Sequence, residues 1–333
     1  MPKTRIIRTR KRKKNRGLKV SFLTVLLLLI GGCGYFAYDV INSSKNISNN
    51  IYQEYFPGHR DEEVKISKEP FSILLAGIEN QDGSKGRADV LLLITVNPKT
   101  EQVFMMSIPR DSRVYVPEKG YNTKINHTYG YEGGIESTIP IVEEMMDVPV
   151  DYFVTTNFEG FEDIVDTLGG VKVDVPFTFR GQLTGSHRYK TFNKGPMELN
   201  GNEALAFVRM RKSDPKGDAG RNERQQQVIK AIIDKGTSFG SITKVDDLMD
   251  DLGENVKTNI RPSKVVNFVR LYSKLKNTEV QNIQIEGTNE TINGASYFIP
   301  DEESIQQNGD IMKQALRGEK VDLNSENSSS SPE

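Results

Sequence analysis

Four charged residues in the first third of the chain have the types and spacing of a phosphate site assisted by a metal ion. Glu79 ends the apolar run FSILLAGI and Asp89 precedes VLLLITV, while Arg110 and Asp111 follow VFMMSI. The tight turn NPKTEQ makes the last two runs antiparallel strands, so we expect all four groups at one edge of a sheet. Strand ends are the usual position for a site in an open α/β sheet. Oxygen ligands completed by water and phosphate suit Mg²⁺ better than zinc.

A second concentration of charge lies in the stretch RMRKSDPKGDAGRNERQQQ, which begins at Arg209. If ALAFVRMR is a strand, Arg209 and Arg211 share one face. KSDPKGDAG has the composition of a loop, and on the following helix Arg221, Arg224 and Gln225 share a face at i, i+3 and i+4. A helix N-terminus favours an anion, and planar guanidinium groups suit phosphate oxygens. This pattern predicts one wall of an anion pocket.

The alternative interpretation of this stretch is a charged surface whose arginines pair with Asp214, Asp218 and Glu223. Exposed ion pairs of that kind contribute only ~0–1 kcal/mol each to the stability of the fold. Stability alone therefore does not explain why so many guanidinium groups are concentrated here. We therefore favour the anion pocket, in which Asp218 orients an arginine rather than opposing the ligand. Lys212 and Lys216 are expected to face solvent.

The beginning of the chain predicts a membrane anchor and the side of the membrane on which these charged groups lie. Residues 1–38 contain ten Lys and Arg and no acid, which leaves 34 basic and 45 acidic side chains in the remainder, a net charge of −11. Val20 to Tyr38 are 19 uncharged residues, enough for about 28 Å of helix and one hydrocarbon core. The preceding positive charge predicts a cytoplasmic N-terminus and an extracellular remainder. This topology accounts for the basic tail without nucleic-acid binding.

Cys33 is the only cysteine and lies inside the predicted span. The outer domain therefore has no disulfide, thiol nucleophile or cysteine metal site, and it needs an ordinary hydrophobic core. The sequence IGGC ending at Cys33 loosely resembles a lipoprotein processing site, so lipid attachment there is an open alternative to a plain single-pass anchor.

The fold class that we expect is α/β (mixed α+β), with a central mixed sheet sandwiched by helices. The continuous runs FSILLAGI and VLLLITV are typical of strands buried on both faces, and VKVDVP and VQNIQIEG are shorter strands. Helical patterns occupy GGIESTIPIVEEMMD, NFEGFEDIVDTLGG, NERQQQVIKAIIDKG, IRPSKVVNFVRLYSKLK and DEESIQQNGDIMKQALRG. NEALAFVRMR is expected to begin as a helix and continue as a strand. The predicted order is a cytoplasmic tail (1–19), a span (20–38), an extracellular linker (39–67), the domain (68–320) and a low-complexity tail (321–333).

Several other chemistries are not supported by the sequence. GSKGRAD has its lysine in the wrong place for a GxxxxGK[ST] phosphate loop, and there is no G-x-S-x-G nucleophile motif. His59, His127 and His187 are far apart and lack metal-binding spacing, which makes a zinc site improbable.

Taken together, the motifs resemble the LytR-CpsA-Psr family of envelope enzymes of Gram-positive bacteria. They are ILLAGIE with GRAD, SIPRD, KINHTYG, NFEGFEDIVDTLGGVKVDV and LNGNEALAFVRMRKSDPKGDAGRNERQQQVI, in the family's order behind the same short tail and single span. The resemblance implies an enzyme that takes a polyprenyl-pyrophosphate-linked glycopolymer, such as teichoic acid or capsule, with its lipid in an apolar tunnel. It implies transfer of the glycopolymer with one phosphate to a peptidoglycan sugar hydroxyl, assisted by Mg²⁺ or Mn²⁺.

The resemblance also implies roles for individual residues. Glu79 and Asp89 would hold the metal, and Asp218 and Arg224 would support the site. The residues implied around the pyrophosphate are Arg87, Arg110, Lys124, Arg209, Arg211, Arg221 and Gln225. Arg110 would be catalytic, and either Asp89 or Asp111 would take the proton of the acceptor hydroxyl.

Two departures from the family pattern concern the metal. The first carboxylate is commonly Asp and is Glu79 here, and the usual Arg-Ser-Asp is RAD, so Ala88 removes one hydroxyl. Both departures keep the charges and put the metal geometry in question more than the reaction.

Two other functions stay open from the sequence: a non-catalytic module that binds wall polymers, and a polyprenyl-pyrophosphate phosphatase.

Overall fold

The computed structural model describes residues 52–323 except for gaps at 56, 61, 80–85, 212–213 and 237–254. Between residues 262 and 277 it describes only residues 264, 267, 268, 271 and 275. The predicted cytoplasmic tail, the predicted span with Cys33, and residues 324–333 lie outside the described part. Within these ranges, no helix combines the length and apolar character needed to cross a membrane.

A six-stranded mixed sheet forms the centre of the domain, in the order β11-β6-β1-β2-β3-β12. Its strands are β1 (Phe71–Glu79), β2 (Arg87–Asn97), β3 (Gln102–Ser107), β6 (Tyr152–Asn157), β11 (Val256–Thr258) and β12 (Val280–Gln284). The β2–β3 pair is antiparallel, as the NPKTEQ turn predicts, and β1 pairs with β2 antiparallel and with β6 parallel. The first two apolar runs therefore occupy the middle of the sheet.

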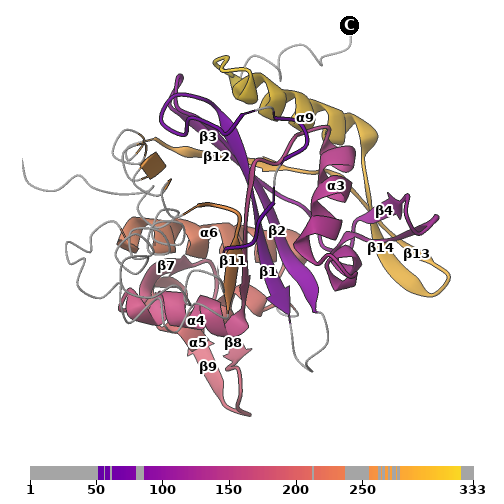
Figure 1. Ribbon diagram of the computed structural model, residues 1–333. Coiled ribbons are helices and arrows are strands. Elements are labelled where there is room, and N and C mark those ends of the chain that lie inside the picture. The colour runs from indigo at the N-terminus through magenta and orange to yellow at the C-terminus, as the bar shows by residue number, and fades with distance from the viewer. Residues whose placement is uncertain are drawn as a thin grey trace, which may run out of the picture.

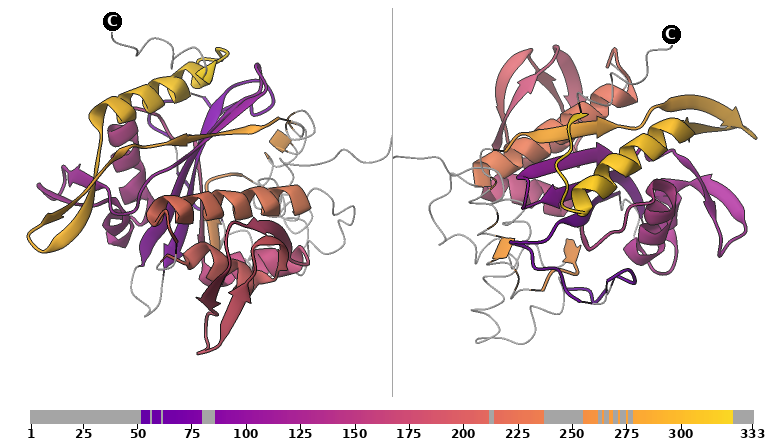
Figure 2. Two further views of the ribbon diagram at one scale, coloured as in Figure 1. Left: turned by 180° about the vertical axis from the view of Figure 1, so that it is seen from behind. Right: turned by 90° about the horizontal axis from the view of Figure 1, so that it is seen from above.

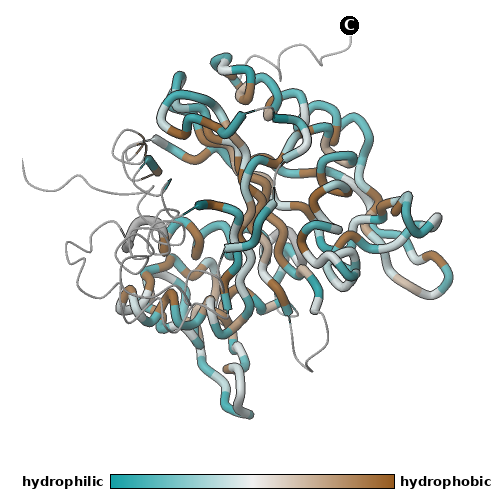
Figure 3. Tube along the Cα trace, in the orientation of Figure 1, coloured by the Kyte–Doolittle hydropathy of each residue, from teal (hydrophilic) through white to brown (hydrophobic). Residues whose placement is uncertain are grey.

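Helices cover both faces of this sheet (Figures 1 and 2). They are α3 (Ile135–Met146), α4 (Phe158–Thr167), α5 (Gly201–Arg209), α6 (Asp218–Gly236) and α9 (Glu302–Leu316). Along β1, Phe71 and Ile73 join the hydrophobic cluster of α4, α5 and α6, whereas Leu74 and Ala76 join that of α3 and α9. Apolar residues are concentrated along the central strands (Figure 3). Burial on both faces explains the uninterrupted apolar runs and confirms the predicted fold class.

One element differs from its predicted type. The segment around Ala204 to Arg209 forms the helix α5 instead of turning into a strand. A capping box between Asn200 and Glu203 starts this helix. Close packing on α4 fixes it, because a Cβ on Gly201 would lie 2.3 Å from the backbone oxygen of Glu162. The strand alternation used to place Arg209 and Arg211 on one face is therefore wrong.

Several short strands were not predicted, because polar residues alternate in them or their apolar runs are brief. They are β4 (Arg113–Val116), β5 (Tyr121–Lys124), β8 (Phe179–Gln182), β9 (Tyr189–Phe192), β10 (Gly195–Leu199), β13 (Gly287–Ile292) and β14 (Ala295–Pro300), while β7 (Val171–Val175) is the predicted VKVDVP strand. They pair as β4–β5, β8–β9, β10–β7 and β13–β14, and a 3₁₀ helix, η1 (Ile125–Gly130), follows β5. The β4–β5 and β13–β14 hairpins lie side by side next to α3, joined by a bridge between Ser112 and Phe298 (Figure 1).

The chain that precedes β1 packs onto the domain, although we expected a linker there. Val64 and Ile66 are buried in the cluster beneath α4 to α6. The buried carboxylate of Asp151 accepts hydrogen bonds from Arg60 Nε at 2.5 Å, from His59 Nε2 at 3.0 Å and from the Ser72 backbone at 2.9 Å. Similarly, Val321 is buried at the other end of the domain, so the packed chain extends beyond residue 320.

Replacing Asp151 with Asn is expected to lower the free energy of unfolding at pH 7 by about 2 kcal/mol, since hydrogen bonds to a charged group are lost. Burial raises the pKa of Asp151, but hydrogen bonds from His59 and Arg60 outweigh it and hold that pKa below the ordinary 3.8. This carboxylate therefore stabilises the fold above pH 3.8, and the contribution is lost as the pH falls through the lowered pKa. Urea unfolding at several pH values measures both effects; equal stability of both proteins at pH 7 would contradict the prediction.

Candidate active site

A cavity of about 420 Å³ lies between the central sheet and the helices α4, α5 and α6. Its inner part is apolar and is lined by Leu75, Val90, Leu92, Val154, Phe161, Ile164, Leu205, Val208, Ile229 and Ile232. Its charged end is lined by Glu79, Asp89, Arg110, Arg209, Arg211, Arg221 and Gln225. An apolar cavity that ends in guanidinium and carboxylate groups suits a ligand with a hydrophobic chain and an anionic head.

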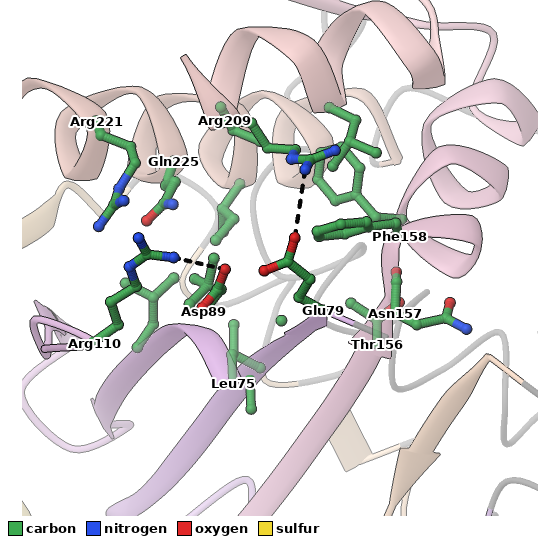
Figure 4. Close-up of a pocket in the computed structure, with 18 of the residues that line it drawn as sticks. Leu75, Glu79, Asp89, Arg110, Thr156, Asn157, Phe158, Arg209, Arg221 and Gln225 are labelled. Atoms are coloured by element: carbon green, nitrogen blue, oxygen red, sulfur yellow. Dashed lines mark hydrogen bonds and ion pairs between the residues drawn. The ribbon is translucent and has the colours of Figure 1, made fainter. Parts of the chain in front are cut away.

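The two carboxylates of the charged end come from neighbouring strands. Glu79 ends β1 and Asp89 lies near the start of β2, which places them together as the sequence predicts (Figure 4). A hydrogen bond with Asp89, burial and the Asp89 charge raise the pKa of Glu79 above its ordinary value. Burial also raises the pKa of Asp89, but the hydrogen bond from Glu79 and the charge of Arg110 hold it below the usual range. The pair therefore keeps one proton to a higher pH than an isolated glutamate would.

Arginines face these carboxylates from two sides. Arg110 Nη1 lies 2.7 Å from Asp89, and Arg209 Nη2 lies 3.5 Å from Glu79. The guanidinium of Arg209 lies over the ring of Phe158, 4.4 Å from its centroid. Figure 4 shows Arg110 and Arg221 directed toward the same space, with Gln225 beside them. That space is surrounded by hydrogen-bond donors, as a pyrophosphate would require.

Arg224 turns away from the cavity, although it was expected on the same face as Arg221. Its guanidinium is 2% exposed, donates from Nε to the Phe207 carbonyl at 3.0 Å and forms an ion pair with Asp214. A further hydrogen bond reaches the Met210 carbonyl. The residue thus supports the site from behind by joining α6 to the end of α5.

The carboxylate of Asp214 orients Arg224. Asp214 is one of the acidic residues that the alternative interpretation, a charged surface, pairs with the arginines. The side chain of Asp218 lies outside the described part, so the predicted role of Asp218 is not addressed. Gly220 leaves the space that Asp214 needs, because a Cβ there would lie 2.2 Å from its carboxylate. Glu223 pairs with the exposed Lys216 at 2.7 Å.

Besides Arg224, three residues assigned to the site do not line the cavity. Asp111 and Lys124 pair at 2.7 Å just outside it, and Asp111 also lies 3.6 Å from Arg110 Nε. Arg87 is exposed at the start of β2, directly opposite Glu79 in the ladder. These residues form the rim next to the charged end rather than its wall.

Two residues of the site were not singled out from the sequence. Asn126 donates a weak hydrogen bond to Asp89 at 3.4 Å, and Phe158 supports Arg209. Asn126 lies within the KINHTYG motif, which could have pointed to it. Phe158 looked like an ordinary core residue, and only the position of α5 reveals its contact.

Glu79 and Asp89 are the groups that could hold a divalent cation. Within the described ranges, no cluster of three or more His, Cys, Asp or Glu forms a protein-only metal site. Mg²⁺ is commonly held by one or two carboxylates together with substrate phosphates, so this donor set fits it.

Comparisons with known proteins agree with this arrangement. The model of the LytR_cpsA_psr family matches residues 37–314. The chain is 41% identical over 312 residues to the polyisoprenyl-teichoic acid--peptidoglycan teichoic acid transferase TagU of Bacillus subtilis, covering 93% of this chain and 99% of that protein. Its sequence is 39% identical to that of the chain in the crystal structure of B. subtilis TagV. The two structures superpose with a TM-score of 0.66, covering 76% of this chain and 99% of that one. A structure described as TagT bound to LIIa-WTA is 34% identical, with a TM-score of 0.66 over 80% and 98% of the two chains.

Proposed function

Because this chain belongs to the LytR_cpsA_psr family, we propose that it is a transferase that attaches a teichoic acid-like glycopolymer to peptidoglycan. The names of its relatives TagU and TagV, both teichoic acid transferases, support this reaction. The observation that carries the proposal is the cavity, whose apolar part leads directly into a charged end made of Glu79, Asp89, Arg110 and Arg221. The donor is a glycopolymer linked to a polyprenyl chain through pyrophosphate.

The cavity provides separate places for the two ends of this donor. Leu75, Leu92 and Val154 on the sheet and Leu205 on α5 form apolar walls for the polyprenyl chain. Burying that chain is favourable by about 0.8 kcal/mol for each CH₂ group. The arginines then receive the pyrophosphate at the end of the cavity, which fixes the phosphorus atom at the rim.

In the proposed reaction, a sugar hydroxyl of peptidoglycan attacks the phosphorus next to the glycopolymer. A new P–O bond forms, the P–O bond to the bridging oxygen breaks, and polyprenyl phosphate leaves. Arg110 and Arg221 hold the phosphoryl oxygens, where negative charge increases in the transition state. We assign the hydroxyl proton to Asp111 because it lies on the outer rim, where the acceptor arrives, and outside the carboxylate pair of Glu79 and Asp89. Lys124, which pairs with Asp111 at 2.7 Å, keeps this carboxylate oriented.

A bound Mg²⁺ or Mn²⁺ would supply further positive charge to the pyrophosphate oxygens.

Replacing Glu79 with Gln is expected to raise the half-saturating Mg²⁺ concentration on the order of 10–100-fold, because a charged ligand is lost. Cation binding requires the deprotonated carboxylate, and the pKa of Glu79 is raised by Asp89. The apparent Mg²⁺ affinity of the wild type should therefore increase as the pH rises through that pKa, and the Gln variant should lose this dependence. Mg²⁺ titrations of transfer at several pH values measure both effects; an unchanged half-saturation would remove Glu79 from the metal site.

The decisive experiment is an assay of the full-length chain with lipid-linked glycopolymer, un-cross-linked peptidoglycan strands and Mg²⁺. We expect phosphodiester-linked polymer on peptidoglycan together with stoichiometric polyprenyl phosphate. Release of polyprenyl phosphate without attachment would instead support a phosphatase, and binding of both substrates without release would support a non-catalytic module. Either result overturns the proposed transfer.

We further propose that residues 20–38 anchor the enzyme in the cell membrane with the domain outside. The supporting features are the basic tail before the apolar run and a substrate whose lipid resides in the membrane. Proteolysis of intact cells should remove the domain and leave the tail protected.

A further inference from the structure

The outer face of the β4–β5 hairpin begins at the rim of the active site. Side chains alternate strictly along this strand: Ser112, Val114 and Val116 are buried, while Arg113 and Tyr115 are exposed. Asp111 precedes them on the exposed side and lies 3.6 Å from Arg110, which lines the cavity. The outward side chains of β4 therefore begin two residues after Asp111, which lies in the preceding turn, and extend about 7 Å from Arg113 to Tyr115 at 3.3 Å per residue.

The neighbouring strands add to the same face. In the β4–β5 ladder, Arg113 is opposite Lys124 and Tyr115 is opposite Asn122, and opposite residues share a face. On the other side of β4, Phe298 bridges to Ser112 and packs against the core, so its neighbour in β14, the half-buried Tyr297, lies on the opposite face of that strand. Lys124 Nζ lies over the Tyr297 ring, 5.7 Å from its centroid.

The chemical character of this face suits a saccharide. Tyr115 is 51% exposed, and Tyr297 adds a second aromatic ring close to the pair formed by Asp111 and Lys124. Aromatic rings can pack against the C–H faces of sugar rings, while an amide such as that of Asn122 bonds to hydroxyl groups.

We infer that this face, formed by Arg113, Tyr115, Asn122, Lys124 and Tyr297, binds the peptidoglycan glycan strand that accepts the polymer. The inference rests on the proposed transfer, which requires an acceptor to reach the phosphorus from outside the cavity. A glycan strand lying across Tyr115 and Tyr297 brings a sugar hydroxyl to Asp111 and Arg110. We call this face the acceptor surface.

The test compares the variants Tyr115→Ala and Tyr297→Ala, singly and together, in the full-length chain. We expect the double variant to raise the KM for un-cross-linked peptidoglycan strands about tenfold, with the KM for the lipid-linked donor unchanged. The matched control is Tyr189→Ala, because Tyr189 is 55% exposed on the separate β8–β9 hairpin and has the cationic side chain of Arg180 over its ring, as Tyr297 has that of Lys124.

A second measurement separates this inference from the proposed function. Isothermal titration of the same glycan strands into the protein, without donor, should give about tenfold weaker binding for the double variant than for the wild type or the Tyr189 control. If the wild type binds the strands in this way but transfers nothing, the transfer proposal fails and the acceptor surface stands. If the wild type transfers normally and the double variant binds and uses the strands equally well, the acceptor surface is wrong. A changed donor KM alone would also overturn it, because the face would then hold the donor polymer.

Discussion

Replacing Arg110 with Ala is expected to reduce the transfer rate by about 10³-fold or more, the largest effect that we predict on activity. Arg110 comes from the end of β3 and contacts Asp89 at 2.7 Å while lining the cavity. It is therefore held in place before the donor arrives, and in the proposed reaction it stabilises the charge that increases on the phosphoryl oxygens. The loss should fall on kcat more than on the donor KM, because the proposed site of the polyprenyl chain is the apolar part of the cavity.

The same substitution should change the pH dependence of transfer. The charge of Arg110 lowers the pKa of both Asp89 and Glu79. Without it both pKa values rise, so the acidic limb of the pH–rate profile is expected to move to higher pH. Arg110→Lys keeps the charge but loses the planar fork, and should recover only part of the rate.

A suitable control for these measurements is Arg180→Ala. Arg180 is an exposed arginine of β8 outside the cavity, so its loss should leave transfer unchanged. Initial rates of polyprenyl phosphate release, measured with saturating acceptor, distinguish the variants. Transfer by the Arg110→Ala protein at the wild-type rate would exclude Arg110 from the reaction.

The sequence predicted the carboxylate side of the site well because it depends on strand pairing. Two long apolar runs and one tight turn determine the order β1-β2-β3, and the register then brings Glu79 close to Asp89 and Arg110. No knowledge of side-chain packing is needed for this step. The same logic predicted the helices on both sides of the sheet, since their apolar periodicity extends over several turns.

The arginine side agrees only in part with the prediction, because Arg209, Arg211 and Arg221 line the cavity whereas Arg224 turns away from it. Arg209 and Arg211 reach the cavity from the end of a helix, although we expected a strand. A short apolar segment such as ALAFV fits either type of element, and here the capping box and the contact with α4 decide. Arg221 and Arg224 are neighbours on one helix, but the buried carboxylate of Asp214 draws only Arg224 inward, which helical spacing cannot reveal.

The small hairpins show a different limit. Residues such as Tyr115 and Tyr297 belong to short strands whose partners are distant in the sequence, so no local pattern marks them. Strand β4 lies beside β14 through the bridge between Ser112 and Phe298, two residues that are far apart in the sequence. The proposed acceptor surface is therefore a property of the assembled fold and could not be derived from motifs.

Replacing Asp214 with Ala is expected to have the largest effect on stability, lowering the free energy of unfolding by about 3–5 kcal/mol. Asp214 is 1% exposed and Arg224 is 2% exposed, so the substitution leaves a buried guanidinium without its counter-charge. Arg224 would keep its hydrogen bonds to the Phe207 and Met210 carbonyls, but these are neutral groups at the end of α5. The position of Arg209 at that helix end depends on the same connection, so transfer should decrease in the folded variant as well.

The neighbouring ion pair provides the control for this prediction. Glu223 and Lys216 pair at 2.7 Å within ten residues of Asp214, but both are exposed. Glu223→Ala should therefore leave the free energy of unfolding unchanged, because water replaces the lost partner. Urea unfolding followed by tyrosine fluorescence measures both variants, since the chain has 12 tyrosines and no tryptophan.

If Asp214→Ala were no less stable than Glu223→Ala, the buried pair could not be what joins α6 to α5. Recovery of stability in Asp214→Ala/Arg224→Leu would identify the uncompensated charge, rather than the lost packing, as the cause.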